Sequence, residues 1–326
     1  MKNVLAALLK TMVTVALFYL LFRKVDFHEF WATLRTARFN LLLLGFAVLC
    51  VGHYVCLFRW RLLTRPLMPV PSLAQLLKIY CIGLFFNLAF PTVVGGDVVK
   101  MYYAGKPSRQ YAQSFAATFL DRDAGMLAMM IIACYATLAH PVSIPGVPVS
   151  LIVWGAFAAF LLVNGAIFTP SVHRLLTSLL HRMRMPRIAG KMDRLSSAFQ
   201  ILGRERNVLL GSLAISLVNQ FLVISVTWLI SEALRLDLSI LYFLAFVPVV
   251  TLVSMIPVSL NGMGLRDYAF RALFSAVGVS PASCLALSLL YFSTMILSAI
   301  PGGVLYAFFK DKRDAREMAA FEADFS

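Results

Sequence analysis

The chain has 326 residues, of which 60% are hydrophobic and only 13% are charged. A soluble domain cannot bury so much apolar surface, so the composition indicates an integral membrane protein. The formal net charge of +14 comes without a zinc pattern, a helix-turn-helix signal or a basic-aromatic module, which argues against nucleic-acid binding. Contact between basic loops and the cytoplasmic leaflet accounts for the charge better.

Six apolar runs have about the length of a membrane-spanning helix, roughly 17 to 25 residues. They lie near residues 4–22, 41–58, 125–139, 151–169, 208–230 and 284–309. The first run follows Lys2 and resembles a signal peptide, but no small-residue cleavage site comes after it. We therefore expect an all-α, polytopic helical bundle with six full spans.

Two stretches place helix-breaking and charged residues inside apolar sequence. They are PTVVGGDVVKMY at 91–102, which follows the apolar run 73–94, and IPVSLNGMGLRDY at 256–268, which follows 239–257. Hydrocarbon offers no water to a broken backbone or an ionised side chain, so such residues persist where they pair, line a wet cavity or serve a function. We predict two re-entrant helical hairpins, and two kinked spans are the alternative.

Basic residues predict the orientation in the membrane. The linker 171–207 is rich in arginine and lysine and belongs in the cytoplasm, whereas the loop 140–150 has neither and faces outward. Both termini are then cytoplasmic, and the two hairpins enter from opposite sides. This predicts inverted repeats at 1–140 and 141–310, followed by a cytoplasmic tail at 311–326. Inverted repeats with broken helices are typical of transporters.

Two further segments mix charged and apolar residues. Residues 25–38 suit a helix in the outer membrane interface, and residues 171–202 suit one in the inner interface. Ordinary solvated linkers are the alternative for both segments. The stretch 108–139 is too long for a single span, so we expect its first part near the surface or inside the bundle, with residues 121–123 at the membrane boundary.

The charged residues of the two motifs suit an anionic head group, because guanidinium groups and helix N-termini both favour phosphate. Arg266 is the first choice, followed by Arg122, Lys100 and Arg271. Backbone approach and helix breaks are assigned to Pro91, Gly95, Gly96, Pro257, Asn261, Gly262 and Gly264.

The acids have two readings. Asp97 and Asp267 either neutralise Arg122 and Arg266 inside the bundle, or bind a cationic head group or carry a proton. Asp121 joins Arg122 as an acid-arginine pair in the same candidate site. As secondary candidates, Asn87 satisfies freed backbone groups, while Tyr102 and Tyr268 act as interfacial anchors or ligands.

No cofactor and no metal is expected. His53 and His140 have no second ligand at metal spacing, and the five cysteines all lie within apolar runs. The run from Asn261 to Arg266 lacks the third glycine and the preceding strand of a dinucleotide site.

The motifs together resemble a known family. The resemblance rests on Pro91, Gly95, Gly96, Asp97 and Lys100, then Asp121–Arg122, then Pro257, Asn261, Gly262, Gly264, Arg266, Asp267 and Tyr268. In order and setting these resemble the flippase-like membrane family represented by the transmembrane region of lysylphosphatidylglycerol synthase, over essentially the whole chain. Asp121 and Asp267 stand where the family pattern usually has glutamate, a shorter side chain that changes the expected contacts.

The resemblance implies a non-enzymatic lipid translocator of the bacterial inner membrane. Its partners are then membrane phospholipids, anionic or aminoacylated, and a separate lipid-modifying enzyme is a further candidate partner. The synthase also has a soluble synthetic domain, but only about seventeen residues follow Phe309 here, so we expect the translocating half alone. Alternatives are a membrane-embedded transferase acting on a lipid-linked substrate and a non-transporting partner of a lipid-synthesis enzyme. The lipid, the direction, the coupling and the oligomeric state are left open.

Overall fold

The protein is helical throughout the part that the structure describes. The computed structural model describes residues 12, 26–90, 95–139, 149–169, 186–256, 259 and 262–309. Within these ranges the chain forms eleven helices and no strand. The predicted all-α membrane architecture is therefore confirmed.

Five of the helices are long and apolar enough to cross a membrane. They are α3 (Phe39–Thr64), α6 (Tyr111–Ala139), α7 (Val149–Phe168), α10 (Arg206–Ala233) and α13 (Pro281–Phe309). They match five of the six predicted spans, and the sixth, 4–22, lies outside the described residues. The chain is thus a multi-pass membrane protein.

Helix α6 begins at Tyr111, well before the apolar run that suggested a span at 125–139. The whole stretch forms one helix of 29 residues, which places Asp121 and Arg122 within it rather than at its end. Both side chains have ionic partners on other helices. This pairing is the physical reason that a helix with internal charges is tolerated here.

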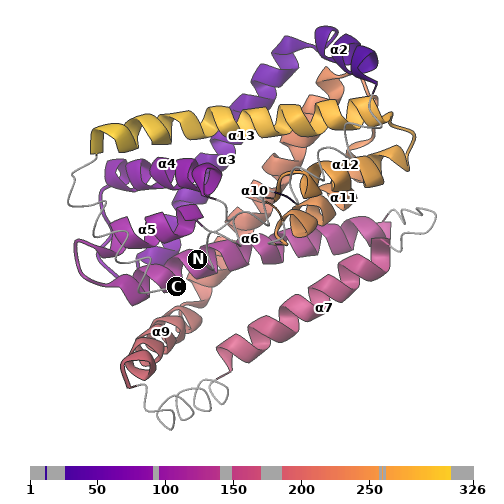
Figure 1. The fold of residues 1–326 in the computed structure, drawn as a ribbon. Coiled ribbons are helices and arrows are strands. Elements are labelled where there is room, and N and C mark those ends of the chain that lie inside the picture. Colours follow the sequence, from indigo (N-terminus) through magenta and orange to yellow (C-terminus); the bar gives the residue numbers. More distant parts are fainter. Residues whose placement is uncertain are drawn as a thin grey trace.

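The two interrupted motifs each form a pair of short helices that pack against each other. α4 (Leu73–Ala89) precedes α5 (Gly95–Gly105), and α11 (Ile240–Ser254) precedes α12 (Leu265–Ser275). In Figure 1 the two pairs lie toward opposite ends of the bundle, between α13 and α6. The helix breaks agree with the predicted hairpins, while re-entry into the membrane and the inverted repeat stay predictions.

Local sequence explains where these short helices begin. Ser72 and Gln75 form a reciprocal capping box at the start of α4. Gly264 precedes α12 with a φ of 77°, and Gly262 nearby has a φ of 71°. This left-handed backbone strongly favours glycine, because a Cβ would clash with the chain. The glycines of the second motif therefore set the turn into α12.

Small residues let α4 approach two neighbours closely. A Cβ built on Gly96 of α5 would overlap the Gly83 carbonyl oxygen of α4. A Cβ built on Gly302 of α13 would likewise overlap the Cys81 carbonyl oxygen. Close backbone contact of this kind is common between membrane helices, where packing replaces the hydrophobic effect. These contacts fix α4 between α5 and α13.

The second pair is held by aromatic packing. Phe274 of α12 lies with its ring centroid 5.0 Å from that of Phe243 and 5.1 Å from that of Phe246, both on α11. All three side chains are fully buried. Such ring pairs stabilise a contact beyond the area that they bury, so α11 and α12 form one packed unit.

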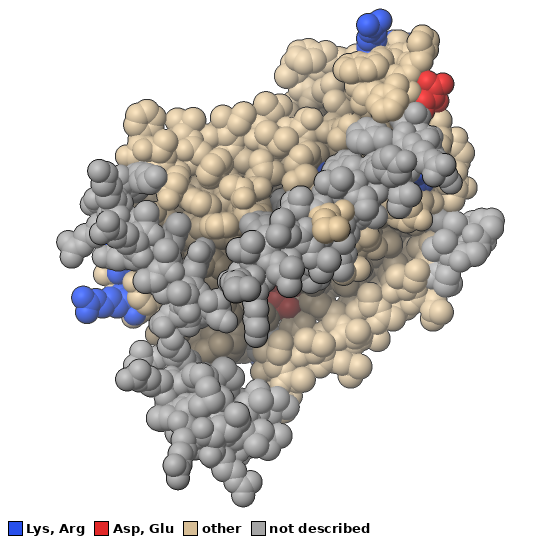
Figure 2. Space-filling view, in the orientation of Figure 1, with Lys and Arg blue, Asp and Glu red and all other residues tan. Residues whose placement is uncertain are grey.

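The outer surface fits an apolar surrounding. α7 exposes large aliphatic side chains, including Leu151, Leu162 and Val163. In Figure 2 most of the charged side chains of the described residues lie near the edges of this face, and one acidic side chain is visible near its middle. A surface on which few charged side chains are exposed is expected of a protein in a bilayer.

Two peripheral helices agree with the predicted amphipathic segments. α2 (Phe27–Arg35) buries Phe30 but exposes Phe27 and Trp31. α9 (Pro186–Arg204) covers the second half of the other segment and ends two residues beyond it, and residues 171–185 fall outside the described part. Helix formation is confirmed for the first segment and for the described part of the second, and their placement in the membrane interfaces stays a prediction.

Candidate functional site

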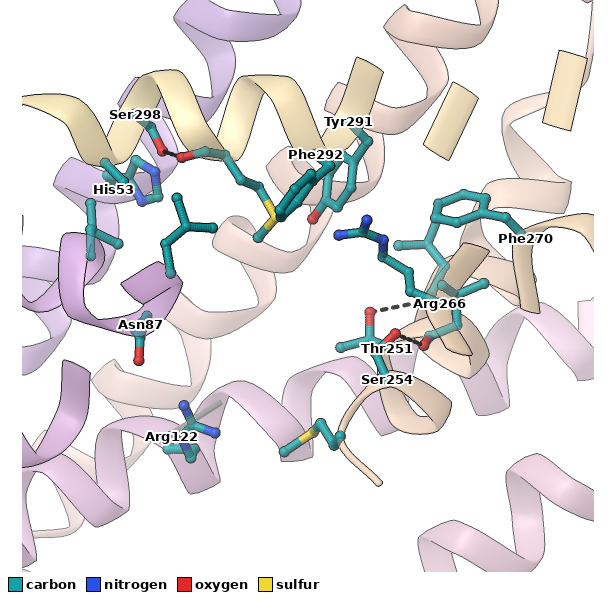
Figure 3. A pocket seen from close by; sticks show the side chains of 17 residues that line it. His53, Asn87, Arg122, Thr251, Ser254, Arg266, Phe270, Tyr291, Phe292 and Ser298 are labelled. Atoms are coloured by element: carbon teal, nitrogen blue, oxygen red, sulfur yellow. Dashed lines mark hydrogen bonds between the residues drawn. The ribbon is translucent and has the colours of Figure 1, made fainter. Parts of the chain in front are cut away.

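A cavity of about 250 Å³ lies among six helices. α3, α4, α6, α11, α12 and α13 line it with His53, Leu84, Asn87, Leu88, Arg122, Val247, Val250, Thr251, Ser254, Met255, Arg266, Phe270, Tyr291, Phe292, Met295, Ser298 and Ala299. Figure 3 shows Arg122 and Arg266 on different sides of this space. The cavity thus brings together residues from both pairs of short helices and from α3, α6 and α13.

Arg122 is held by the first motif. Its Nε donates to Asp97 Oδ2 at 2.7 Å, and its Nη2 lies 2.6 Å from the same oxygen. Lys100 Nζ is 3.5 Å from the other carboxylate oxygen of Asp97 and 4.4 Å from the centroid of the Tyr80 ring. Asp97 and Lys100 are both buried. One carboxylate therefore contacts two cations, and these three side chains together carry an excess of positive charge.

The break between α4 and α5 is stabilised by an amide. Asn87 Oδ1 accepts a hydrogen bond from the Gly96 backbone N–H at 2.8 Å. This N–H lies in the first turn of α5, where backbone donors have no partner within the helix. Asn87 thus makes a hydrogen bond of the kind that its predicted role at a helix break requires, and it also lines the cavity.

Arg266 enters the cavity from the N-terminus of α12. Its Nη2 lies 3.3 Å from Asp267 Oδ1, and its Cζ lies 4.7 Å from the centroid of the Phe292 ring. The residue is only 8% exposed, yet its Nε finds no hydrogen-bond partner among the described residues. A buried N–H that carries positive charge and has no acceptor is costly. Arg266 is therefore the group of the site that most needs an external anion.

Asp267 has a structural role beside this arginine. Its Oδ2 accepts from the Gly264 backbone N–H at 2.9 Å, and Ser288 donates a hydrogen bond to its Oδ1. The carboxylate is fully enclosed and caps the first turn of α12. The predicted pairing of Asp97 with Arg122 and of Asp267 with Arg266 is thus present in the structure.

Asp121 pairs with a residue that the sequence reasoning did not include in the site. Arg59 of α3 donates from Nε to Asp121 Oδ1 at 2.6 Å and from Nη1 to Ser216 Oγ of α10 at 2.9 Å. Both ionic side chains are buried, and neither lines the cavity. Arg59 comes directly after the apolar run 41–58 and close to Arg61 and Arg65, so local sequence gave no sign of its burial.

Four other polar lining residues were also missed. Thr251, Ser254 and Ser298 lie in apolar helical runs, and the His53 Nε2 is buried without a hydrogen-bond partner in the described part of the chain. Single hydroxyls and one histidine inside membrane helices are too common to be selected by spacing alone. The alignment of α3, α11 and α13 around one cavity makes them neighbours.

The other predicted site residues that the structure describes do not line the cavity. Arg271 is half-buried on α12 and does not line the cavity, and Tyr268 is 56% exposed. Tyr102 is buried and stacks with Tyr111 at 6.2 Å between ring centroids. Gly95 packs closely against the Phe90 side chain.

Three predicted residues, Pro91, Pro257 and Asn261, lie outside the described residues. Among the residues that the structure describes, no group of three or more His, Cys, Asp or Glu side chains could hold a metal ion.

The fold and the site define a multi-pass helical membrane protein with two broken helix pairs around an arginine-lined cavity. Residues 7–302 match the family model described as the lysylphosphatidylglycerol synthase TM region. Because the match covers most of the chain, the protein belongs to this family, as the motifs predicted.

Two curated relatives have a similar length. The chain is 26% identical over 270 residues to a UPF0104 membrane protein of Methanothermobacter thermautotrophicus, covering 74% of this chain and 79% of that protein. It is 25% identical over 299 residues to a UPF0104 membrane protein of Pyrococcus horikoshii, covering 82% and 87%. No solved structure matches the chain.

Proposed function

We propose that the protein moves a phospholipid or a related amphiphilic lipid between the two leaflets of the inner membrane. The observation that carries this proposal is the buried Arg266, which lines the cavity together with Arg122 and whose Nε has no hydrogen-bond partner among the described residues. The membership of a family named after part of a lipid synthase supports a lipid as the ligand.

The physical obstacle to lipid movement is the head group. A phosphate crossing hydrocarbon loses its hydration, which costs several kcal/mol or more. Two guanidinium groups replace part of that hydration with charge-assisted hydrogen bonds, and arginine binds phosphate oxygens in pairs. Apolar lining residues such as Leu84, Val247 and Met295 are compatible with acyl chains that stay close to the cavity.

The arrangement of the helices supports a mechanism of alternating access. The two broken pairs lie toward opposite ends of the bundle (Figure 1), and each contributes one side of the cavity. Rocking of one half against the other would open the cavity toward one leaflet and then toward the other, as in transporters built from repeats. In this proposal the hairpins are re-entrant, the repeats are inverted, and both termini are cytoplasmic.

The proposal is tested with purified protein in liposomes that contain lipids labelled on the head group. Transport is measured as loss of label accessibility from outside, with anionic, zwitterionic and aminoacylated lipids, with and without a proton gradient. Arg266→Gln keeps a polar side chain but removes the charge, and we expect the rate to fall about 10- to 100-fold, the equivalent of one charged hydrogen bond. Arg271→Gln is the matched control on the same helix, and we expect little change.

Two results would contradict the proposed lipid translocation. If the native protein moves no lipid of the panel faster than protein-free liposomes do, the proposal is wrong. Equal losses in Arg266→Gln and Arg271→Gln would show that the cavity is not the path.

A further inference from the structure

We infer that the cavity selects a head group that combines a negatively charged phosphate with free hydroxyl groups, and that it disfavours a cationic aminoacyl head group. This inference rests on the proposed lipid function of the same cavity and names its substrate class. It is carried by the charge and the hydrogen-bonding state of the residues that line the cavity.

The arginine side chains that line the cavity give it a positive charge. Arg122 and Arg266 both line the cavity, and none of the described lining residues is a carboxylate. The neighbouring acids are already engaged: Asp97 by Arg122 and Lys100, and Asp267 by Gly264, Ser288 and Arg266. An ammonium group placed here would meet two guanidinium groups and no free acid. Like charges in a water-poor site repel strongly, so an added amine is unfavourable.

The serine and threonine hydroxyl groups of the lining are arranged as acceptors. Thr251 donates its O–H to the Val247 carbonyl at 2.8 Å, and Ser254 donates to the Val250 carbonyl at 2.6 Å. Ser298 on the other side donates to the Met295 carbonyl at 2.8 Å (Figure 3). Because each proton is used within its own helix, each oxygen offers only lone pairs to a ligand. A ligand that forms hydrogen bonds with these three oxygens must therefore supply the hydrogen-bond donors.

A head group that carries a negative phosphate and several hydroxyl groups matches both the guanidinium groups and the acceptor oxygens of the lining. Its phosphate oxygens accept from the guanidinium groups of Arg266 and Arg122, and its hydroxyls donate to the lining serine and threonine oxygens. A choline head group has no hydrogen-bond donor. The cavity volume of about 250 Å³ is below the roughly 300–1,000 Å³ of pockets that enclose whole drug-sized ligands, so it suits a head group with the acyl chains outside.

The test compares lipids that differ in one property. Binding to the purified native protein is measured by competition against a labelled anionic lipid, using phosphatidylglycerol, phosphatidylmethanol, phosphatidylcholine and lysylphosphatidylglycerol. Phosphatidylmethanol keeps the negative phosphodiester but has no free hydroxyl. We expect phosphatidylglycerol to bind best, phosphatidylmethanol several-fold more weakly, and the zwitterionic and cationic lipids about tenfold more weakly or worse. Soluble glycerophosphoglycerol should compete only weakly, because it has no acyl chains.

Variants assign the hydroxyl preference to the cavity. Thr251→Val keeps the shape of the side chain and removes the acceptor, so the advantage of phosphatidylglycerol over phosphatidylmethanol should shrink while phosphatidylmethanol binds as before. Ser225→Ala is the control, because Ser225 makes the same kind of hydrogen bond to the Phe221 carbonyl on the exposed side of α10. We expect no change in its lipid ranking.

The results separate the inference from the proposed function. Equal or tighter binding of lysylphosphatidylglycerol or phosphatidylcholine overturns the inference, and so does a hydroxyl preference that survives Thr251→Val. Soluble glycerophosphoglycerol binding as tightly as the lipid would assign the site to a free phosphate compound instead. If the expected ranking holds but no lipid moves in liposomes, the selectivity stands and translocation fails. If lysylphosphatidylglycerol moves as fast as phosphatidylglycerol, translocation stands and the selectivity fails.

Discussion

The buried ion pair between Arg59 and Asp121 gives the sharpest test of what holds the bundle together. Asp121→Asn removes the negative charge without changing the size of the side chain. Arg59 is only 5% exposed, and it donates hydrogen bonds to Asp121 on α6 and Ser216 on α10. In the variant, the guanidinium stays buried with a neutral amide in place of the carboxylate that lies 2.6 Å from its Nε. We expect a marked loss of stability.

The expected size follows from the cost of breaking a buried pair. Removing one partner of such a pair typically costs about 3–5 kcal/mol, because the other charge is left uncompensated. This range equals about two to three and a half powers of ten in the ratio of folded to unfolded protein. The Ser216 hydrogen bond persists and the amide oxygen still accepts from Arg59, so we place the effect at the lower end, about 3 kcal/mol.

Reversible unfolding in detergent, followed by tryptophan fluorescence or helix content, measures this free energy. Asp237→Asn is the matched control, since Asp237 is exposed and has a φ of 47° that asparagine also tolerates. The double variant Arg59→Met/Asp121→Leu should recover most of the loss, because an apolar pair of similar volume removes both buried charges. A cost below about 1 kcal/mol for Asp121→Asn, the value typical of exposed pairs, would refute a buried, uncompensated arginine.

Three further changes test the packing and the first motif. Gly96→Ala should destabilise the protein by about 1–3 kcal/mol, because its Cβ would overlap a carbonyl oxygen of α4; Gly155→Ala, which meets nothing within 4 Å, should instead raise the unfolding midpoint slightly. Asp97→Asn should slow lipid movement in liposomes, because Arg122 loses the carboxylate that orients it; an unchanged rate with an intact fold would contradict that role. Ser72→Ala should lower the unfolding free energy by about 1 kcal/mol through loss of the cap of α4, and an unchanged midpoint would show that this helix end is fixed by packing instead.

The local pattern of apolar and helix-breaking residues was sufficient to predict much of the helical architecture. The apolar runs predicted α3, α7, α10 and α13 to within a few residues at most ends, because a membrane helix satisfies its own backbone and its length is set by the bilayer. The same reasoning located both helix breaks, because proline, glycine and polar residues cluster there. Single prolines inside apolar sequence did not end a helix, since Pro248 lies within α11 and Pro301 within α13. It failed at the start of α6, where Asp121 and Arg122 look unfavourable until their partners are known.

The sequence also predicted the ionic pairs of the two motifs. Asp97 and Arg122 are separated by 25 positions, but two opposite charges inside an apolar bundle have strong reason to meet. Arg266 and Asp267 are adjacent, so their pairing needed no fold. Arg59 and Ser216 are separated by 157 positions, and no periodicity links residues so far apart.

The sequence by itself determined that this is a helical membrane protein, where its helices break and which charges are costly to bury. It did so because transfer from water to lipid penalises each polar group individually, whatever the fold around it. The tertiary structure alone decided which charges share a cavity. It placed Arg122 and Arg266 around one space, withdrew Asp267 into a helix cap and Asp121 into a pair with Arg59, and turned the oxygens of Thr251, Ser254 and Ser298 into acceptors at the same site. These relations depend on how six helices pack, which no single stretch of sequence encodes.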